Sequence, residues 1–350
     1  MTDDRMFGVV LTGHGGPEAL VWRDDLPRPE ALPGEVLIRV GAAAVNNTDV
    51  NTRLAWYASG DGMDQEDAAW SGKPLEFPRI QGADVCGEIV AVGADVPEAR
   101  IGERVIVEPS LREAEGARRD PPWYFGTEVD GGFAEYATVA ARHAHRIVSD
   151  LTDIELASFP CSYSTAENLL TRAGVTARDR VLVTGASGGV GSAAVQLAVA
   201  RGAEVIGIAS AAKAPEIEAL GAARVLDRDA DLAATLGTGA VDVVIDLVGG
   251  PGWPPLLDLL RPGGRYAISG AIAGPEVTLD LRKLYLKDLS FFGCTVLQPG
   301  VFEALVERIE TGAIRPLVAA SYPLRDIGAA QEAFQAKRHV GKIVLEVRRD

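Results

Sequence analysis

The 350-residue sequence contains few cysteines and no long apolar segment. Its three cysteines, Cys86, Cys161 and Cys294, are far apart, which argues against a disulfide framework and against a structural zinc site of four cysteines. No run of about 18 uncharged apolar residues is present, so we expect no membrane-spanning helix. Residues 1–5 show neither the basic nor the apolar part of a secretory signal. We therefore expect a soluble, cytoplasmic protein.

Basic residues are also scarce, with 34 Lys and Arg against 49 Asp and Glu and a formal net charge of −15. Nucleic-acid binding requires a basic face, and no run rich in Lys or Arg is present. We expect neither a nucleic acid nor a membrane as partner. An acidic surface repels anionic ligands at long range, so local donors must hold any ligand that carries phosphate.

The chain is long enough for two domains. Up to about residue 150 it contains short apolar runs bounded by Gly, Pro and charged residues, which predict strands at 36–40, 86–92 and 104–107. Two long polar stretches, 59–78 and 110–130, interrupt these runs. Stretches of this length are usually functional lids or disordered segments, and both interpretations are open.

From residue 180 to about 296, strand-like and helix-like segments alternate. Continuous apolar runs, typical of strands buried on both faces, lie at 181–184, 205–209, 243–246 and 266–269. A helix is predicted at 190–201, and the alternation indicates an α/β fold with a doubly wound parallel sheet. After residue 298 we predict helices at 301–311 and 327–334 and a strand at 342–347.

A glycine-rich turn follows the first of these strands and precedes the helix. It matches the dinucleotide-binding pattern G-x-G-x-x-G, with alanine at the first glycine position. The second glycine lets the backbone approach a pyrophosphate, and the third lets helix and strand pack closely. The helix N-terminus supplies N–H groups and a positive dipole. The predicted cofactor-binding residues of this turn are Ala186, Ser187, Gly188, Gly189, Val190 and Gly191.

The end of the second strand bears on the choice between NAD and NADP. NAD sites place Asp or Glu about 20 residues after the turn, on the ribose 2′-hydroxyl. This sequence has no carboxylate at 209–213, whereas Ser210 and Lys213 offer donors for a 2′-phosphate. The residues therefore favour NADPH, with the alternative that Lys213 is only a solvated helix residue.

The whole chain resembles the medium-chain dehydrogenase/reductase superfamily, particularly its zinc-free quinone-oxidoreductase branch. The motifs that carry the resemblance are at 44–49, 81–93, 131–136, 185–191 and 341–345. The resemblance implies a GroES-like β-barrel catalytic domain formed by 1–158 and 298–350. A Rossmann dinucleotide-binding domain is expected at 159–297. It also implies a homodimer paired through the last Rossmann strand, here 289–296, in which Phe291 and Phe292 are adjacent.

The alcohol-dehydrogenase branch carries three zinc ligands near these motifs. Here Asn46 and Ala83 stand at the positions of the first Cys and the His, and Cys161 matches the third ligand. One soft ligand does not hold a catalytic zinc, even if Asp49 or Asp84 lends an oxygen. The branch's four-cysteine structural lobe is also missing from 110–130. We expect no metal.

Without a metal, the reaction expected is direct hydride transfer to an electron-poor acceptor, a quinone or an α,β-unsaturated carbonyl compound. The resemblance places Asn46 and Asn47 near the nicotinamide ribose and the substrate oxygen, and Arg228 beside the adenosine phosphate. Thr165 and Lys342 are also expected at the cofactor. Arg53 and Tyr57 are expected on one face of a helix, with Tyr57 either a donor to the acceptor oxygen or only a wall of the site. Asp49 is either catalytic or a structural hydrogen-bond partner.

Three alternatives remain open at this level. One is an enoyl-thioester reductase of the same superfamily, for which the acidic stretch 59–78 lacks the basic approach expected. Another is a zinc-dependent alcohol dehydrogenase. The third, of a different class, is a non-catalytic NADPH-binding sensor or structural protein. The sequence does not identify the natural acceptor, because fold alone says little about substrate.

Overall fold

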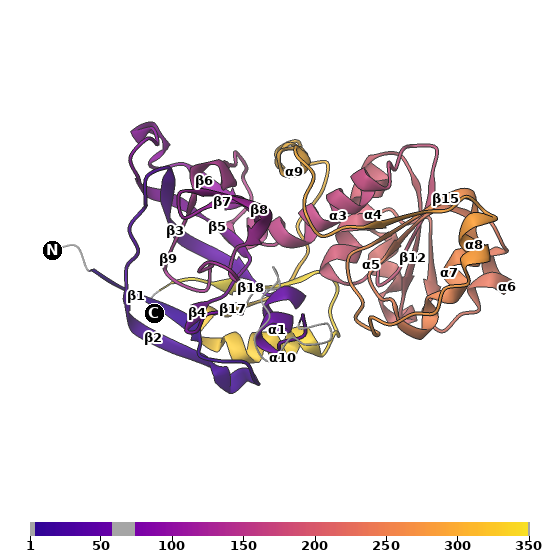
Figure 1. The fold of residues 1–350 in the computed structure, drawn as a ribbon, viewed down its shortest axis with the longest axis horizontal. Helices are drawn as coiled ribbons and strands as arrows, with labels where there is room; N and C mark the ends of the chain where they lie inside the picture. The colour runs from indigo at the N-terminus through magenta and orange to yellow at the C-terminus, as the bar shows by residue number, and fades with distance from the viewer. Residues whose placement is uncertain (1–3, 58–73, 349–350) are drawn as a thin grey trace. The chain divides into compact units, whose positions relative to one another are not determined.

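A computed structural model describes residues 4–57 and 74–348. The chain divides into two compact units, labelled by their helices and strands in Figure 1. No helix within the described ranges is long and apolar enough to cross a membrane. Unit 1 consists of Met1–Cys161, Pro316–Arg338 and Lys342–Asp350, and unit 2 of Ser162–Arg315 and His339–Gly341.

The second boundary between the units lies later in the chain than the predicted boundary at residue 298. Helix α9 (Val301–Glu310) and the residues around it belong to unit 2 because side chains of that unit hold them. The amide of Asn168 accepts the N–H of Gln298 at 3.0 Å. Glu167 pairs with Arg308 at 3.6 Å. These contacts assign 298–315 to unit 2, a division that spacing along the sequence does not reveal.

Unit 1 is built on a seven-stranded sheet of order β10-β6-β5-β3-β18-β17, with β9 paired to β3. The C-terminal strand β18 pairs antiparallel with β3, the third strand of the chain; both are labelled in Figure 1. The strands of this sheet are β3 (Glu35–Ala44), β5 (Asp84–Val92), β6 (Arg104–Val107), β9 (Tyr136–Ala140), β10 (Ala144–Arg146), β17 (Val318–Pro323) and β18 (Lys342–Glu346).

A smaller sheet of order β2-β1-β4 and three helices complete the core of unit 1. Apolar side chains of alternating strand positions, among them Val36, Ile38 and Val40, form one buried cluster. The remaining elements are β1 (Arg5–Leu11), β2 (Leu20–Pro27), β4 (Arg79–Ile80), α1 (Asn47–Arg53), α2 (Asp153–Leu156) and α10 (Ile327–Gln335).

The stretch 110–130 contains a hairpin, with one register shift between Leu111 and Glu113, rather than a disordered segment. Strands β7 (Ser110–Ala114) and β8 (Ala117–Tyr124) pair antiparallel, with Leu111 opposite Trp123. Glu115 and Gly116 connect them with φ of 50° and 67°, as a two-residue hairpin turn requires. Of the other stretch, 59–78, only 74–78 falls within the described residues.

Unit 2 contains a six-stranded sheet of order β13-β12-β11-β14-β15-β16 in which every pair is parallel. This order is that of a doubly wound dinucleotide-binding fold, which confirms the predicted fold class. Its strands are β11 (Arg180–Val183), β12 (Glu204–Ala209), β13 (Arg224–Asp227), β14 (Val241–Asp246), β15 (Leu260–Ile268) and β16 (Ser290–Gly293).

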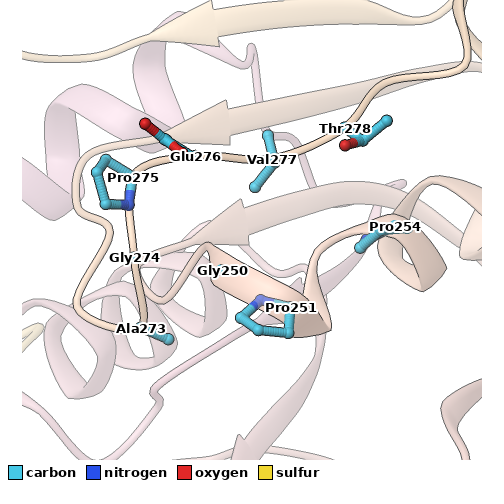
Figure 2. A pocket seen from close by; sticks show the side chains of 9 residues that line it. All are labelled: Gly250, Pro251, Pro254, Ala273, Gly274, Pro275, Glu276, Val277 and Thr278. Atoms are coloured by element: carbon cyan, nitrogen blue, oxygen red, sulfur yellow. The ribbon is translucent and has the colours of Figure 1, made fainter.

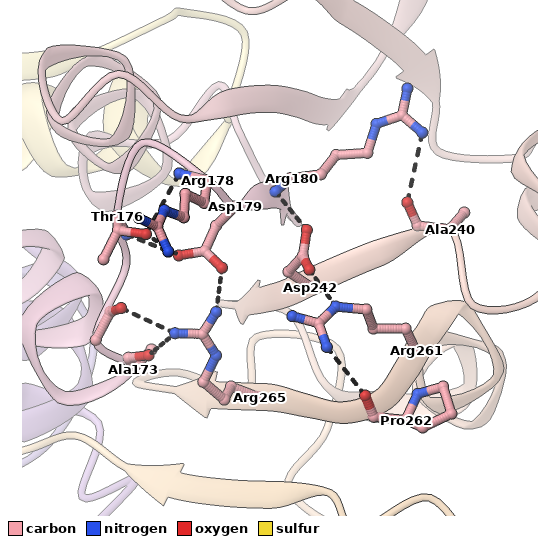
Figure 3. Close-up of polar contacts among 11 residues, drawn as sticks. Ala173, Thr176, Arg178, Asp179, Arg180, Ala240, Asp242, Arg261, Pro262 and Arg265 are labelled. Atoms are coloured by element: carbon pink, nitrogen blue, oxygen red, sulfur yellow. Dashed lines mark hydrogen bonds and ion pairs between the residues drawn. The ribbon is translucent and has the colours of Figure 1, made fainter.

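Helices connect these strands, and the predicted helix at 190–201 corresponds to α4 (Gly189–Ala200). At the amino ends of β11 and β14, arginines bind acidic side chains (Figure 3). Arg265 binds Asp179, and Asp242 accepts the N–H of Arg180 at 2.7 Å. The other helices are α3 (Pro160–Arg172), α5 (Ala214–Glu218), α6 (Leu232–Leu236), α7 (Pro254–Leu259) and α8 (Leu281–Tyr285).

Candidate active site and cofactor site

The glycine-rich turn of unit 2 is shaped to receive a pyrophosphate. Gly185 has φ of 59° and turns the chain from β11 towards the N-terminus of α4. A Cβ on Gly191 would lie 2.1 Å from the carbonyl oxygen of Gly185, so only glycine permits this packing. A Cβ on Gly188 would meet nothing nearer than 3.5 Å, which leaves space in front of the turn. The residues present therefore fit a dinucleotide.

The donors predicted for a 2′-phosphate gather beside this turn. Ser210 immediately precedes the short 3-10 helix Ala211–Lys213, and the Lys213 ammonium donates to the Ser187 hydroxyl at 3.5 Å. Partial burial and the nearby Arg228 guanidinium lower the pKa of Lys213. A carboxylate, Asp227, also lies here. It accepts the N–H groups of Ala211 and Asp229 at 2.9 and 3.0 Å.

A hollow of about 580 Å³ lies at the carboxyl ends of β14 and β15 (Figure 2). In a doubly wound sheet this is the edge at which ligands bind. The loops on its two sides pack backbone to backbone, since a Cβ on Gly250 would lie 2.4 Å from the carbonyl oxygen of Ala273. Its lining residues are Gly250, Pro251, Pro254, Ala273, Gly274, Pro275, Glu276, Val277 and Thr278.

In unit 1, a buried polar network surrounds the N-terminus of α1. Asn46 precedes the helix, and its N–H donates to the Asp49 carboxylate at 2.8 Å. The Asn46 amide donates to Asp84 at 2.8 Å. The Lys342 ammonium donates to the Asn46 amide oxygen and, at 2.8 Å, to Asp84. The structure thus brings Asn46, Asp49 and Lys342 together, although Lys342 is far from the others in sequence.

The charges of this network are almost fully removed from water. Asp84 is 0%, Lys342 2% and Asp49 3% exposed. Burial raises the pKa of Asp49 to about 7, and the Asp84 charge adds to the effect, while the Asn46 N–H and the Lys342 ammonium oppose it. Two carboxyl groups and one ammonium therefore share a site of low dielectric constant.

Cys161 extends this network to a tyrosine that the sequence analysis did not select. The Cys161 N–H donates to Asp84 at 2.6 Å. The Cys161 sulfur lies 3.1 Å from the hydroxyl of Tyr124, at the end of β8. Tyr124, Cys161 and Ala83 form one apolar contact cluster. Sequence reasoning missed Tyr124 because its contacts depend on the hairpin. The aromatic pair 123–124 in a polar stretch was the available signal.

The prediction that Arg53 and Tyr57 share one helix face is wrong. Helix α1 ends at Arg53, and Ala55 has φ of 55°, which takes the chain out of the helix before Tyr57. Arg53 is 1% exposed and donates to the side chain of Gln331 on α10 at 3.0 Å and to the backbone carbonyl of Gly15, so it joins α1 to α10 and to the chain before β2. Tyr57 is half-buried, and burial raises the pKa of its hydroxyl.

Thr165 is half-buried on α3. At the three positions where the resemblance implies zinc ligands, the structure has Asn46, Ala83 and Cys161. Within 4–57 and 74–348, no group of three or more His, Cys, Asp or Glu side chains is arranged to hold a metal ion. Asn is a poor zinc donor and Ala is none, so these residues do not fit a three-ligand zinc centre.

Comparison with known proteins places these features in a family. Residues 32–149 match the alcohol dehydrogenase GroES-like domain, and 189–311 match the zinc-binding dehydrogenase model. The chain is 31% identical to acryloyl-coenzyme A reductase of Metallosphaera sedula, covering 97% of this chain and 99% of the relative. It is 29% identical to human quinone oxidoreductase, with 97% of each chain covered.

Among solved structures, a protein of Sinorhizobium meliloti assigned as an alcohol dehydrogenase is 47% identical, with a TM-score of 0.92 and coverage of 99% of this chain and 98% of that one. The two matched domains follow the order expected for a GroES-like domain and a Rossmann domain. The full-length similarity at 31% identity agrees with the glycine-rich turn and the parallel sheet order. The chain belongs to the medium-chain dehydrogenase/reductase superfamily of oxidoreductases.

Proposed function

We propose that this protein is an NADPH-dependent, zinc-independent reductase of quinones or α,β-unsaturated carbonyl compounds. The observation that carries this proposal is the Lys342 ammonium, which contacts Asp84 at 2.8 Å and also the side chain of Asn46. Asn46 occupies the position of the first zinc ligand in the alcohol-dehydrogenase branch. A resident positive charge therefore lies beside that position.

Electrostatics make this arrangement unfavourable for a divalent metal. The ammonium already compensates Asp84 in a buried environment, and a second cation near it would be repelled strongly at low dielectric constant. Carbonyl reduction to an alcohol relies on a Lewis acid to polarise the oxygen. Acceptors that are already electron-poor need this help least, which supports quinones and conjugated carbonyl compounds.

NADPH is supported by the donors beside the glycine-rich turn. When bound, a reduced nicotinamide supplies the hydride. Lys213 lies within 3.5 Å of Ser187, and Ser210 precedes the same short helix, so both donors lie beside the turn that would receive the cofactor. The opposing charge of Asp227 is engaged by two backbone N–H groups. We expect NADPH to bind about tenfold more tightly than NADH, roughly 1.4 kcal/mol.

A second candidate is reduction of an enoyl thioester, which is also an α,β-unsaturated carbonyl compound. The acryloyl-coenzyme A reductase that matches along the full length supports it. The two candidates are separated by steady-state rates with acryloyl-coenzyme A against simple quinones and enones of equal reactivity. A higher kcat/KM for the thioester would favour the second candidate.

The test combines metal analysis, chelation and cofactor titration. Purified protein is expected to contain far less than one zinc per chain, and NADPH oxidation by a quinone should survive prolonged chelation. Lys213→Ala should weaken NADPH binding and leave NADH binding unchanged, while Lys283→Ala on α8 serves as the matched control. Stoichiometric zinc, with activity lost on chelation and restored by zinc, would move the enzyme to the alcohol-dehydrogenase branch. Equal affinity for both cofactors would exclude NADPH specificity.

A further inference from the structure

Tyr124 lies beside two of the three positions at which the resemblance implies zinc ligands in the alcohol-dehydrogenase branch. The ring packs against Ala83 and Cys161, which occupy two of the three ligand positions, and the hydroxyl lies 3.1 Å from the Cys161 sulfur. Residues of a three-ligand catalytic zinc site surround the place where the metal holds the substrate oxygen. A phenol hydroxyl therefore occupies the neighbourhood in which that branch binds an oxygen atom.

The backbone around Tyr124 is fixed before any substrate arrives. The Tyr124 N–H donates to the Glu128 carboxylate at 2.8 Å, and the Tyr124 carbonyl accepts the N–H groups of Thr127 and Glu128, each at 3.1 Å. Gly126, with φ of 80°, closes this turn against the backbone of Gly82. The backbone of Tyr124 is thus held in place by a short, hydrogen-bonded turn, and the packing of the ring against Ala83 and Cys161 orients the side chain, as preorganised electrostatic stabilisation requires.

The residues of this cluster differ in how completely they are buried. Tyr124 and Cys161 are each 8% exposed, whereas Ala83 and Asp84 are both 0% exposed. Tyr124 and Cys161 are thus the least buried residues of the network, followed by Asn46 at 5%. A ligand that reaches the network from solvent is expected to contact these residues before Asp84.

The protonation states suit hydrogen-bond donation. Burial raises the pKa of Cys161 to about 12 and raises the pKa of Tyr124 well above its usual value, so both groups keep their protons at neutral pH. Either the thiol or the phenol can be the donor in their 3.1 Å contact, and when the thiol donates, the phenol directs its own proton to a third atom. A raised pKa makes the phenol a poor acid, which fits a group that stabilises charge without giving up its proton.

We propose that the Tyr124 hydroxyl, supported by Cys161, is the hydrogen-bond donor that stabilises the acceptor's carbonyl oxygen during reduction; this inference rests on the proposed function. Hydride adds to the electron-poor carbon, and the electron pair of the carbon–carbon or quinone double bond moves towards the oxygen. The acceptor oxygen then carries the negative charge, and the Tyr124 O–H donates a hydrogen bond to it. Water then supplies the proton that completes the product, and no further oxidant or reductant is needed.

The experiment compares Tyr124→Phe with Tyr322→Phe, a matched control on β17. Removing a single oxyanion donor typically lowers kcat about 100- to 1,000-fold, and we expect a loss of this order for Tyr124→Phe. The KM for NADPH and the midpoint of unfolding should stay unchanged, which separates a chemical role from a structural one. Cys161→Ala should reduce kcat less, since it removes only the group that supports the phenol.

A binding measurement tests the inference independently of turnover. 4-Nitrophenolate, a stable oxyanion, is titrated by its absorbance into protein saturated with NADP⁺. We expect Tyr124→Phe to bind it about tenfold more weakly than the parent and Tyr322→Phe to bind it equally well. If the parent protein reduces no acceptor, the proposed function fails while this titration still decides the role of Tyr124. Unchanged kcat and unchanged phenolate affinity in Tyr124→Phe, or a loss confined to Tyr57→Phe, would overturn the inference.

Discussion

At the scale of single residues, the buried network of unit 1 is dominated by charge compensation. Asp84 has no exposure, and it receives donors from Asn46, Lys342 and the backbone of Cys161. A buried ion pair contributes little net stability compared with apolar residues of equal volume, but removing one partner leaves an uncompensated charge. Removing one partner of this network is therefore expected to destabilise the protein more than replacing both partners by apolar residues.

We predict that Lys342→Met lowers the free energy of unfolding by about 3–5 kcal/mol, because the Asp84 carboxylate is left buried and uncompensated. Urea denaturation at pH 7 measures the change. Adding Asp84→Asn to Lys342→Met removes the orphaned charge and should recover most of the loss. If the double variant is as unstable as the sum of the two single variants, the pair is not coupled and the charge argument is wrong.

A second residue-scale prediction concerns pH. The pKa of Asp49 is about 7 in the folded protein, against 3.8 for an ordinary aspartate. Between these values the folded state holds a proton that the unfolded state releases, so this group makes stability fall as the pH rises. The Asn side chain of Asp49→Asn cannot titrate. The free energy of unfolding of this variant, measured by denaturation at several pH values, should therefore fall less steeply than that of the parent between pH 3.8 and about 7. Asp229→Asn, at an exposed position, should retain the parent slope.

At the scale of elements, the two glycines of the cofactor turn have different structural roles. A Cβ at Gly191 would strike the Gly185 carbonyl, whereas one at Gly188 would meet only ordinary contact distances. One glycine is therefore required by the packing of α4 against β11. The other keeps space open in front of the turn.

A glycine-to-alanine substitution should therefore affect stability at one of these positions and cofactor binding at the other. Gly191→Ala should lower the free energy of unfolding by about 1–3 kcal/mol, as overpacking does. Gly188→Ala should leave stability unchanged but weaken NADPH binding, because the added methyl group occupies the space of the pyrophosphate. Thermal unfolding and fluorescence titration of NADPH measure the two effects. A Gly188→Ala protein that binds NADPH as the parent does would show that the pyrophosphate lies elsewhere.

Elements with local signals were predictable from the sequence, and those that depend on distant contacts were not. The buried strands and α4 follow from continuous apolar runs and the glycine-rich turn. The β7–β8 hairpin was missed because its polar strands carry no apolar alternation over 110–120. The end of α1 depends on the positive φ of Ala55, which no spacing rule indicates. The contact between Asn46 and Lys342 spans 296 residues, so only the fold reveals it.

At the scale of the whole molecule, exposed apolar side chains gather along one segment of unit 2. Strand β16 is the edge of the six-stranded sheet, and Phe291 on it is 37% exposed. In the segment that precedes this strand, the exposed large apolar residues are Ile272, Val277, Leu281, Tyr285 and Leu286. An edge strand that carries an exposed aromatic side chain is a favourable surface for pairing with a second chain. This supports the homodimer that the resemblance implies.

We therefore predict a dimeric mass in light scattering at micromolar concentration. Leu286→Glu places a charge at a position that is 71% exposed in the single chain, and it should convert the dimer to monomer. Ile101→Glu, at a 49% exposed position of unit 1, is the matched control and should remain dimeric. Each chain carries a net charge of −15, so repulsion opposes association and salt weakens that repulsion. The dimer should accordingly tighten from low to moderate ionic strength. A parent protein that is monomeric at every salt concentration would leave β16 as a solvated edge and exclude this interface.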